Sequence, residues 1–154
     1  MKHTTPSWLL GLGLWAFLGL AQGADRFSYN NDGSEVTDNT TGLVWRRCPE
    51  GMSWIDNTCT GPATKYTHQA ALQRAQTQTG WRLPNIKELS TIVDPIRANP
   101  GIDPTAFPAT PPDRFWSSSP YAGDSNSAWN VFFFNGTTYM SDRNVSNLYV
   151  RLVR

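Results

Sequence analysis

The sequence predicts an α+β fold, a mainly antiparallel sheet with two helices. Short strand-like segments bounded by Gly, Asn and Asp occur toward both ends of the chain. Two segments with helical periodicity lie between them, and a Pro-rich loop separates the second helix from the later strands. Helices that are grouped rather than alternating with strands are typical of this class.

The first 23 residues have the features of an export signal. Lys2 and His3 give a basic start, an apolar run follows from Trp8 to Leu20, and an Ala-Gln-Gly exit supplies small residues. The run of about 13 residues is short of the ~20 that span a bilayer, so a retained anchor is the weaker alternative. We predict a signal peptide over 1–23 and one domain over 24–154. The protein is then secreted, periplasmic or at the cell surface, with no membrane span after signal cleavage.

The predicted domain is neutral and rich in aromatic residues. Of the 13 basic and 12 acidic residues only Lys2 lies in the leader, which leaves a formal net charge of zero. A nucleic-acid binder needs a basic stripe to neutralise phosphates, so the charge argues against this class. Most of the seven Trp and seven Phe remain, enough for a core and for part of a surface.

Cys48 and Cys59 are the only cysteines, and export favours their pairing. In the chain-entropy model a bridge over so short a loop contributes roughly 3 kcal/mol. The alternative is a metal site, but two cysteines without a nearby His fall short of four ligands. We therefore predict a disulfide, within a segment of little regular pattern.

Three short strands are predicted before the cysteines. The segment Phe27 to Asp38 is strand, turn and strand, with Asn31-Asp32-Gly33 supplying the turn. Leu43-Val44-Trp45 forms a third, apolar strand. After the long loop Arg97 to Pro112, everything beyond Arg114 is again strand and turn.

The first helix is predicted over Thr67 to Thr79. This segment is rich in Ala, Gln and Leu, contains no Gly or Pro, and ends at Gly80. Helical spacing places Ala71, Leu72 and Ala75 on one side, which we expect to be buried.

The second helix is predicted to begin at Asn85, with a capping box completed by Glu88. Asp94-Pro95 stops it. We expect its apolar stripe to pack against Trp45 or Trp81; the stripe consists of Ile86, Leu89, Ile92 and Val93.

The most informative segment is a predicted hairpin from Ala128 to Asp142. Asn135-Gly136 favours a two-residue type I′ turn, which would fix the register. The pairs would then be Phe134 with Thr137, Phe132 with Tyr139, and Asn130 with Ser141. These six share one face because side chains alternate with period two.

The two faces of this hairpin differ in chemistry. One is apolar at nearly every position and is predicted as core; it carries Trp129, Val131, Phe133, Thr138 and Met140. The other mixes aromatic rings with hydroxyl and amide groups, as antibody paratopes do, and is predicted as a solvent-exposed binding face. The alternative is that Phe132 and Phe134 pack beneath another element, which would bury the strand on both faces.

Several motifs together resemble the Lcl C-terminal domain family, named after the terminal module of a bacterial collagen-like adhesin. They are the Asp-Gly-Ser at 32–34, Thr-Gly-Leu-Val-Trp at 41–45, Gly-Trp-Arg-Leu-Pro at 80–84, Phe-Trp-Ser-Ser-Ser at 115–119 and the closing Val-Arg-Leu-Val-Arg at 150–154. The resemblance implies a C-type-lectin-like fold, shared with formylglycine-generating enzymes. It also implies an exported, surface-associated binding module. The adhesin is associated with sulfated glycans, for which a neutral chain is poorly suited.

The C-terminal segment also resembles the variable region of diversity-generating retroelement proteins, in which fixed residues alternate with rewritten ones. The fixed-looking residues fall on the predicted core face. The resemblance implies that the others are diversified: Phe132, Phe134, Thr137, Tyr139, Ser141, Asp142, Asn144, Val145, Ser146, Asn147 and Leu148. Together with Asn130, which shares the predicted exposed face, they make up the predicted ligand surface.

The sequence argues against an enzyme. His68 is the single histidine after the leader, and we expect it to be a surface or capping residue. The serines at 117–119 have no base at a recognisable spacing. Formylglycine-generating enzymes use cysteines late in their fold, whereas both cysteines here come early. Asp94, Asp103 and Asp113 do not have a calcium-loop spacing.

We therefore predict a non-enzymatic ligand-binding module without cofactor or metal. Its partner is a protein or another surface macromolecule, and the sequence does not identify it. A glycan-binding adhesin is the alternative, and a formylglycine-generating-type enzyme is a remote one.

Overall fold

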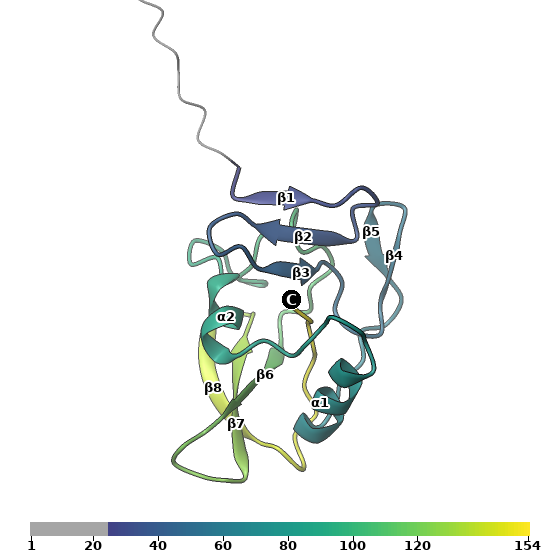
Figure 1. The fold of residues 1–154 in the computed structure, drawn as a ribbon. Coiled ribbons are helices and arrows are strands. Elements are labelled where there is room, and N and C mark those ends of the chain that lie inside the picture. Colours follow the sequence, from purple (N-terminus) through teal and green to yellow (C-terminus); the bar gives the residue numbers. More distant parts are fainter. Residues whose placement is uncertain (1–24) are drawn as a thin grey trace, which may run out of the picture.

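The computed structural model describes residues 25–154, so the predicted signal peptide lies outside the described part of the chain. The elements are β1 (Phe27–Tyr29), β2 (Glu35–Asp38), β3 (Val44–Arg46), β4 (Ser53–Ile55), β5 (Thr58–Thr60), α1 (His68–Gln76), α2 (Ile86–Thr91), β6 (Arg114–Pro120), β7 (Ser127–Phe132) and β8 (Thr137–Asp142). The strands form three antiparallel sheets, β1-β2-β3, β4-β5 and β6-β7-β8 (Figure 1). The α+β class is confirmed.

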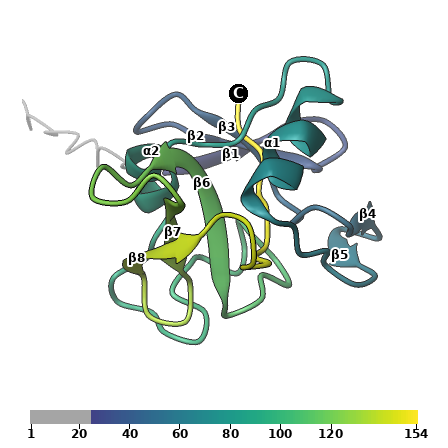
Figure 2. The same cartoon turned by 90° about the horizontal axis from the view of Figure 1, so that it is seen from below.

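The C-terminal residues return to the first sheet. Trp45 of β3 forms an antiparallel bridge with Val153, and the backbone N–H of Val44 donates to the carbonyl of Arg154 (3.0 Å). Both ribbon views place the C-terminus beside β3 (Figures 1 and 2). The N-terminal strands and the last residues are therefore held together. The N-terminal and C-terminal strands nevertheless form the separate sheets β1-β2-β3 and β6-β7-β8.

Helix α1 begins as predicted but ends earlier. The Thr67 hydroxyl accepts the N–H of Ala70 as N-cap, and Ala71 and Ala75 are buried. The last helical residue is Gln76 rather than a residue near Thr79. This difference lies in the final turn, where helix ends fray and tighten.

Helix α2 carries the predicted capping box. The Asn85 side chain accepts the N–H of Glu88, whose carboxylate accepts the N–H of Asn85 in return. Leu89 and Ile92 are buried in one cluster with Trp45, as predicted. The alternative neighbour Trp81 packs against the other cluster.

Two apolar clusters make up the core. The cluster beneath α2 contains Val36, Trp45, Leu89, Ile92, Ile102, Ala106, Phe107, Phe115, Val131, Phe133 and Val153. The cluster beneath α1 contains Ala71, Ala75, Leu83, Trp116, Ala128, Leu148, Val150 and Leu152. Phe115 and Trp116 are neighbours on β6 yet belong to different clusters, since side chains alternate along a strand. The sheet β6-β7-β8 is therefore covered on both faces over part of its length.

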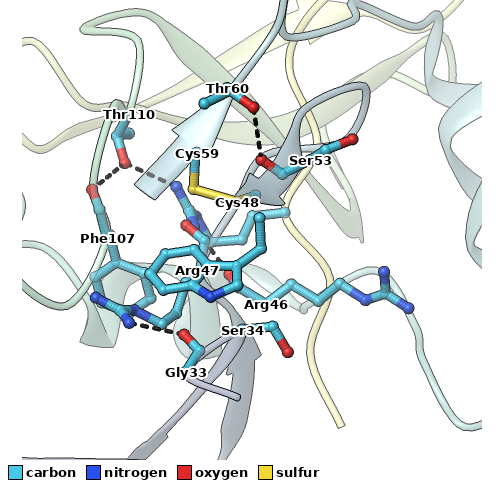
Figure 3. The surroundings of a disulfide bond; sticks show 12 residues. Gly33, Ser34, Arg46, Arg47, Cys48, Ser53, Cys59, Thr60, Phe107 and Thr110 are labelled. Carbon is cyan, nitrogen blue, oxygen red and sulfur yellow. Dashed lines mark hydrogen bonds between the residues drawn. A yellow bond between two sulfur atoms is a disulfide. The ribbon is translucent and has the colours of Figure 1, made fainter. Parts of the chain in front are cut away.

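The predicted disulfide is present, with the Cα atoms of Cys48 and Cys59 5.4 Å apart (Figure 3). The prediction of an irregular segment around it is wrong, because β4 and β5 form a hairpin there. Asp56 (φ 51°) and Asn57 (φ 60°) occupy its two-residue turn. Both residue types tolerate positive φ, so the local sequence favours this turn.

A fully buried arginine joins the C-terminal segment to the rest of the fold. The Arg151 guanidinium donates to the carbonyls of Arg46 (2.8 Å) and Arg47 and to the Thr110 hydroxyl (2.7 Å). Its carbon atom lies 4.8 Å from the centre of the Phe107 ring. Burial, together with the charge of Arg47, lowers the pKa of Arg151 to about 9, so it is still protonated at neutral pH.

Candidate ligand-binding surface

The β7–β8 hairpin does not have the predicted two-residue turn. Its loop comprises the four residues Phe133–Gly136, and Phe132 pairs with Thr137. Each predicted partner on β8 is therefore displaced by two positions. Because the displacement is an even number, the same strand side chains still share a face.

Tertiary hydrogen bonds account for this turn. The N–H of Phe133 donates to the carbonyl of Asp113 (3.0 Å), and the carbonyl of Phe133 accepts the N–H of Gly101 (2.5 Å). The carbonyl of Phe134 accepts the N–H of Asn99 (2.8 Å). These bonds hold both residues against the loop before β6 and outside the β7–β8 ladder, which overrides the local preference of an Asn-Gly pair.

Three aromatic rings gather at this end of the hairpin. Phe132 and Phe134 stack with ring centres 5.6 Å apart, and Tyr139 meets Phe132 edge to face at 6.1 Å. Phe134 is 44% exposed, and the other two are half-buried. Phe132 and Phe134 are therefore not both buried beneath another element, which was the alternative to a solvent-exposed face. We call Phe132, Phe134, Thr137 and Tyr139 the hairpin surface.

An arginine from the neighbouring strand lies against these rings. Arg114 of β6 pairs with Phe132, and its guanidinium carbon lies 4.8 Å from the centre of the Tyr139 ring. No side-chain hydrogen bond or ion pair of Arg114 is found within residues 25–154. The nearby Lys65 is paired with Asp113 at 2.7 Å, and this hydrogen bond raises the pKa of Lys65. The Arg114 guanidinium therefore lies at the edge of the hairpin surface without a hydrogen-bonded acid, while the carboxylate of the adjacent Asp113 lies within reach of its charge.

Three residues predicted to contact ligand are buried instead. Asn130 has no exposed area, and its amide donates to the hydroxyl of Ser141 (3.0 Å), which is also buried. Leu148 packs in the cluster beneath α1. The prediction is wrong for these three, because the α1 side of the core covers this face toward the far end of the hairpin.

The remaining predicted residues form a separate patch. The Asp142 carboxylate accepts the N–H groups of Asn144 (2.8 Å) and Val145 (3.3 Å), which shapes the loop after β8. Val145 is 74% exposed, Asn144 and Asn147 are exposed, and Ser146 is half-buried. This loop lies at the opposite end of β8 from Thr137, about 17 Å away at ~3.4 Å per residue. The predicted continuous surface is thus two patches.

The predicted core face is correct on β7 and wrong on β8. Val131 and Phe133 are buried and Trp129 is half-buried, but Thr138 is exposed and Met140 is 44% exposed. Strand β8 is the edge of its sheet, so the core reaches β7 and not beyond.

His68 is not the surface residue that we expected. It is 1% exposed, and its Nε2 lies 2.9 Å from the carbonyl of Ser117, to which it must donate. Its Nδ1 is then free to accept the Nε–H of Arg143 (3.1 Å). Burial lowers the pKa of His68, which keeps the ring neutral. The Ser117 hydroxyl donates to the carbonyl of Trp129 (2.7 Å), so these groups do not form a nucleophile–base pair.

Two of the three aspartates considered as calcium ligands make contacts within their own segments. Asp94 pairs with Arg97, and Asp103 accepts the N–H of Thr105. Residues 25–154 contain no group of three His, Cys, Asp or Glu side chains that could hold a metal ion. Over the same range no helix has the length and apolar character needed to cross a bilayer.

A family model described as the Lcl C-terminal domain matches residues 34–154. The match runs from the start of β2 to the last residue and includes the whole hairpin surface. Searches among curated proteins and among solved structures give no significant match.

Proposed function

The chain belongs to the Lcl C-terminal domain family, and from this premise we propose that it is an exported, non-enzymatic module that binds a macromolecule through the hairpin surface. One observation carries the proposal. Three aromatic rings pack against one another at the surface, with Phe134 exposed and the guanidinium of Arg114 beside them without a hydrogen-bonded acceptor among residues 25–154. Tyr and Arg at a partly exposed aromatic cluster are the residue types that dominate binding energy in protein interfaces.

The neighbouring chemistry supports binding rather than catalysis. His68 is engaged on both ring nitrogens by Ser117 and Arg143 and kept neutral by burial, which suits a structural role. Both cysteines are joined in a disulfide, so neither supplies the thiol of a formylglycine-generating-type enzyme. Turnover of any substrate by the purified domain would contradict the proposal.

The test is a matched pair of substitutions on β8. Binders selected from a random peptide display library against the wild-type domain should lose about 30-fold in affinity to Tyr139→Ala, because anchor residues are worth about 2 kcal/mol. Met140→Ala is the control, since Met140 is a solvent-accessible neighbour on the same strand that points to the other face. Equal losses in the two variants, or binders that map elsewhere, would contradict the assignment of the surface.

A glycan-binding adhesin is the second candidate, favoured by a different surface feature. The guanidinium groups of Arg46 and Arg154 both lie over Trp81, at 4.7 and 4.8 Å from the ring. Binding on a glycan array that weakens with added salt and is lost in Arg46→Met would favour this candidate. Salt-independent peptide binding at the hairpin surface would favour the first.

We further propose that residues 1–23 are removed on export and that the domain is C-type-lectin-like. Exported protein should begin at Ala24. Its mass should be lower than that of the reduced chain by two hydrogen atoms, because Cys48 and Cys59 are joined. A free thiol or a retained leader in the exported protein would contradict this proposal.

Diversification of the hairpin is also a proposal. It requires a near-copy of the DNA that encodes this segment, differing mainly at adenines, beside a reverse-transcriptase gene. Exposure of Phe134, which no folding requirement explains, supports it. Absence of such a copy would remove the diversification while leaving the binding surface in place.

A further inference from the structure

We propose that the partner recognised by the hairpin surface is an acidic peptide segment, in which a carboxylate flanked by apolar side chains binds Arg114. The inference rests on the proposed function and specifies the chemistry of its ligand. It follows from the position of one guanidinium group relative to three rings.

The rings hold the Arg114 guanidinium in place without using its donors. The carbon atom of the group lies 4.8 Å from the centre of the Tyr139 ring and 5.7 Å from that of Phe132. A cation over a ring face is attracted by the ring quadrupole, while its N–H groups stay free for another acceptor. A carboxylate matches the planar fork of the guanidinium and can accept two hydrogen bonds from it.

Most of the other arginines that lie over rings donate to acceptors within the fold, and Arg46 is an exception. Arg47, between Tyr29 and Trp54, donates to three backbone carbonyls. Arg154 pairs with Glu35 at 2.6 Å. Arg46 makes no side-chain hydrogen bond in the described chain, but it lines a hollow of about 200 Å³ together with the carboxylates of Glu35 and Glu50. The Arg114 guanidinium lies over the rings and is hydrogen-bonded to no acid of residues 25–154, although the Asp113 carboxylate is within reach of its charge.

The surroundings favour a peptide over a polyanion. The four residues of the hairpin surface carry no charge, and the charge of the nearby Lys65 is neutralised by Asp113. Nucleic acids and sulfated polymers are bound by several cations at once. Beside the hairpin surface, Arg114 is the one cation found against the rings among the described residues. A carboxylate can accept hydrogen bonds from Arg114, and apolar side chains next to it can pack on the rings of Phe132, Phe134 and Tyr139.

The experiment uses peptides selected from a random library against the wild-type domain and a double-mutant cycle on the strongest of them. We expect selected sequences to be enriched in Glu or Asp next to apolar residues. Replacing the peptide's acidic residue by its amide should weaken binding to wild type about tenfold, as loss of a charged hydrogen bond does. Against Arg114→Met, which keeps an apolar stem on the rings, the same replacement should change binding less than about twofold.

Lys87→Met is the matched control. Lys87 is exposed on α2, so this variant loses the same charge without touching the hairpin surface. It should retain the full tenfold preference for the acidic peptide. If Lys87→Met reduces the preference as much as Arg114→Met does, the effect is one of net charge and the inference is wrong.

The outcomes separate this inference from the proposed function. Peptides that bind at Tyr139 but show no acidic preference, or a preference that survives Arg114→Met, overturn the acidic ligand and leave the binding surface intact. Binders whose affinity is unaffected by Tyr139→Ala overturn the proposed function itself. Binding of heparin or RNA that depends on Arg114 and excludes the peptides would assign the site to a polyanion and also overturn the inference.

Discussion

Arg151 and Arg114 lie over aromatic rings in similar ways but in opposite environments. The Arg151 guanidinium is 4.8 Å from the Phe107 ring, is fully buried and donates to two carbonyls and a hydroxyl. The Arg114 guanidinium is equally far from the Tyr139 ring, is half-buried and donates to no side chain or carbonyl of residues 25–154. Stacking therefore does not distinguish a structural arginine from a binding one.

The acceptors make the difference. A buried charge must be hydrogen-bonded, and Arg151 donates from its two terminal nitrogens to the carbonyls of Arg46 and Arg47 and to the Thr110 hydroxyl. Its Nε has no hydrogen-bond partner among the described residues. At the surface water can satisfy the donors of Arg114, so the fold need not provide acceptors. A ligand can then replace that water. The same pairing of residue types thus stabilises the fold in one place and offers a binding group in the other.

Replacing Arg151 should have the largest effect. Arg151→Met removes the donors to the carbonyls of Arg46 and Arg47 and to the buried Thr110 hydroxyl. We expect a loss of about 3–5 kcal/mol in the free energy of unfolding, measured by chemical denaturation. A loss below about 1 kcal/mol would show that these hydrogen bonds do not hold the C-terminal segment, and the comparison would fail on its buried side.

The second-largest effect on stability is expected for a substitution in α2, which packs in the cluster that contains the rings of Phe107 and Phe115. Leu89 has no exposed area and packs in the cluster that contains Phe107 and Phe115. Leu89→Ala should cost about 2–5 kcal/mol, as truncations in a packed core do. A change near zero, with the fold intact by circular dichroism, would mean that α2 is not packed as described.

Acidification should weaken the fold through His68. Burial lowers the pKa of His68 in the folded state below its unfolded value of about 6.5, so the unfolded chain binds the proton more readily. The stability that the neutral ring provides is therefore complete above pH 6.5 and declines as the pH falls below it. Denaturation curves at pH 7.5 and 5.5 should show this decline in wild type and a smaller one in His68→Gln. Identical declines would show that other groups cause it.

Arg114→Met should have the smallest effect on stability. Its guanidinium makes no hydrogen bond within the described chain, and its stem can be replaced by that of Met. The free energy of unfolding should change by no more than about 0.5 kcal/mol, as for most surface substitutions. A loss approaching that of Arg151→Met would mean that Arg114 is structural, and the distinction between the two arginines would disappear.

Local sequence signals predicted the disulfide and the starts of both helices correctly, whereas both helices end earlier than predicted. Asn85 and Glu88 cap each other because both partners lie within three residues, and no distant contact is needed. Cys48 and Cys59 pair because the chain offers no other thiol. The hairpin at Asp56-Asn57 was not predicted, although its signal, two adjacent residues that tolerate positive φ, is equally local.

The hairpin at Asn135-Gly136 was mispredicted for a physical reason. Its turn is set by hydrogen bonds with distant residues: the N–H groups of Asn99 and Gly101 donate to the carbonyls of Phe134 and Phe133, and the N–H of Phe133 donates to the carbonyl of Asp113. No local pattern reveals these bonds. Period-two alternation correctly grouped Phe132 with Tyr139, because the even displacement preserved the faces.

Alternation along β7 and β8 was enough to state which side chains share a face, since it depends only on backbone geometry. Whether a face is covered depends on what packs over it. Asn130 and Ser141 are buried by the α1 side of the core, whereas Phe134 is exposed and Met140 lies on an edge strand. Burial is a property of contacts between distant segments, so only the tertiary structure could separate the ligand surface from the core.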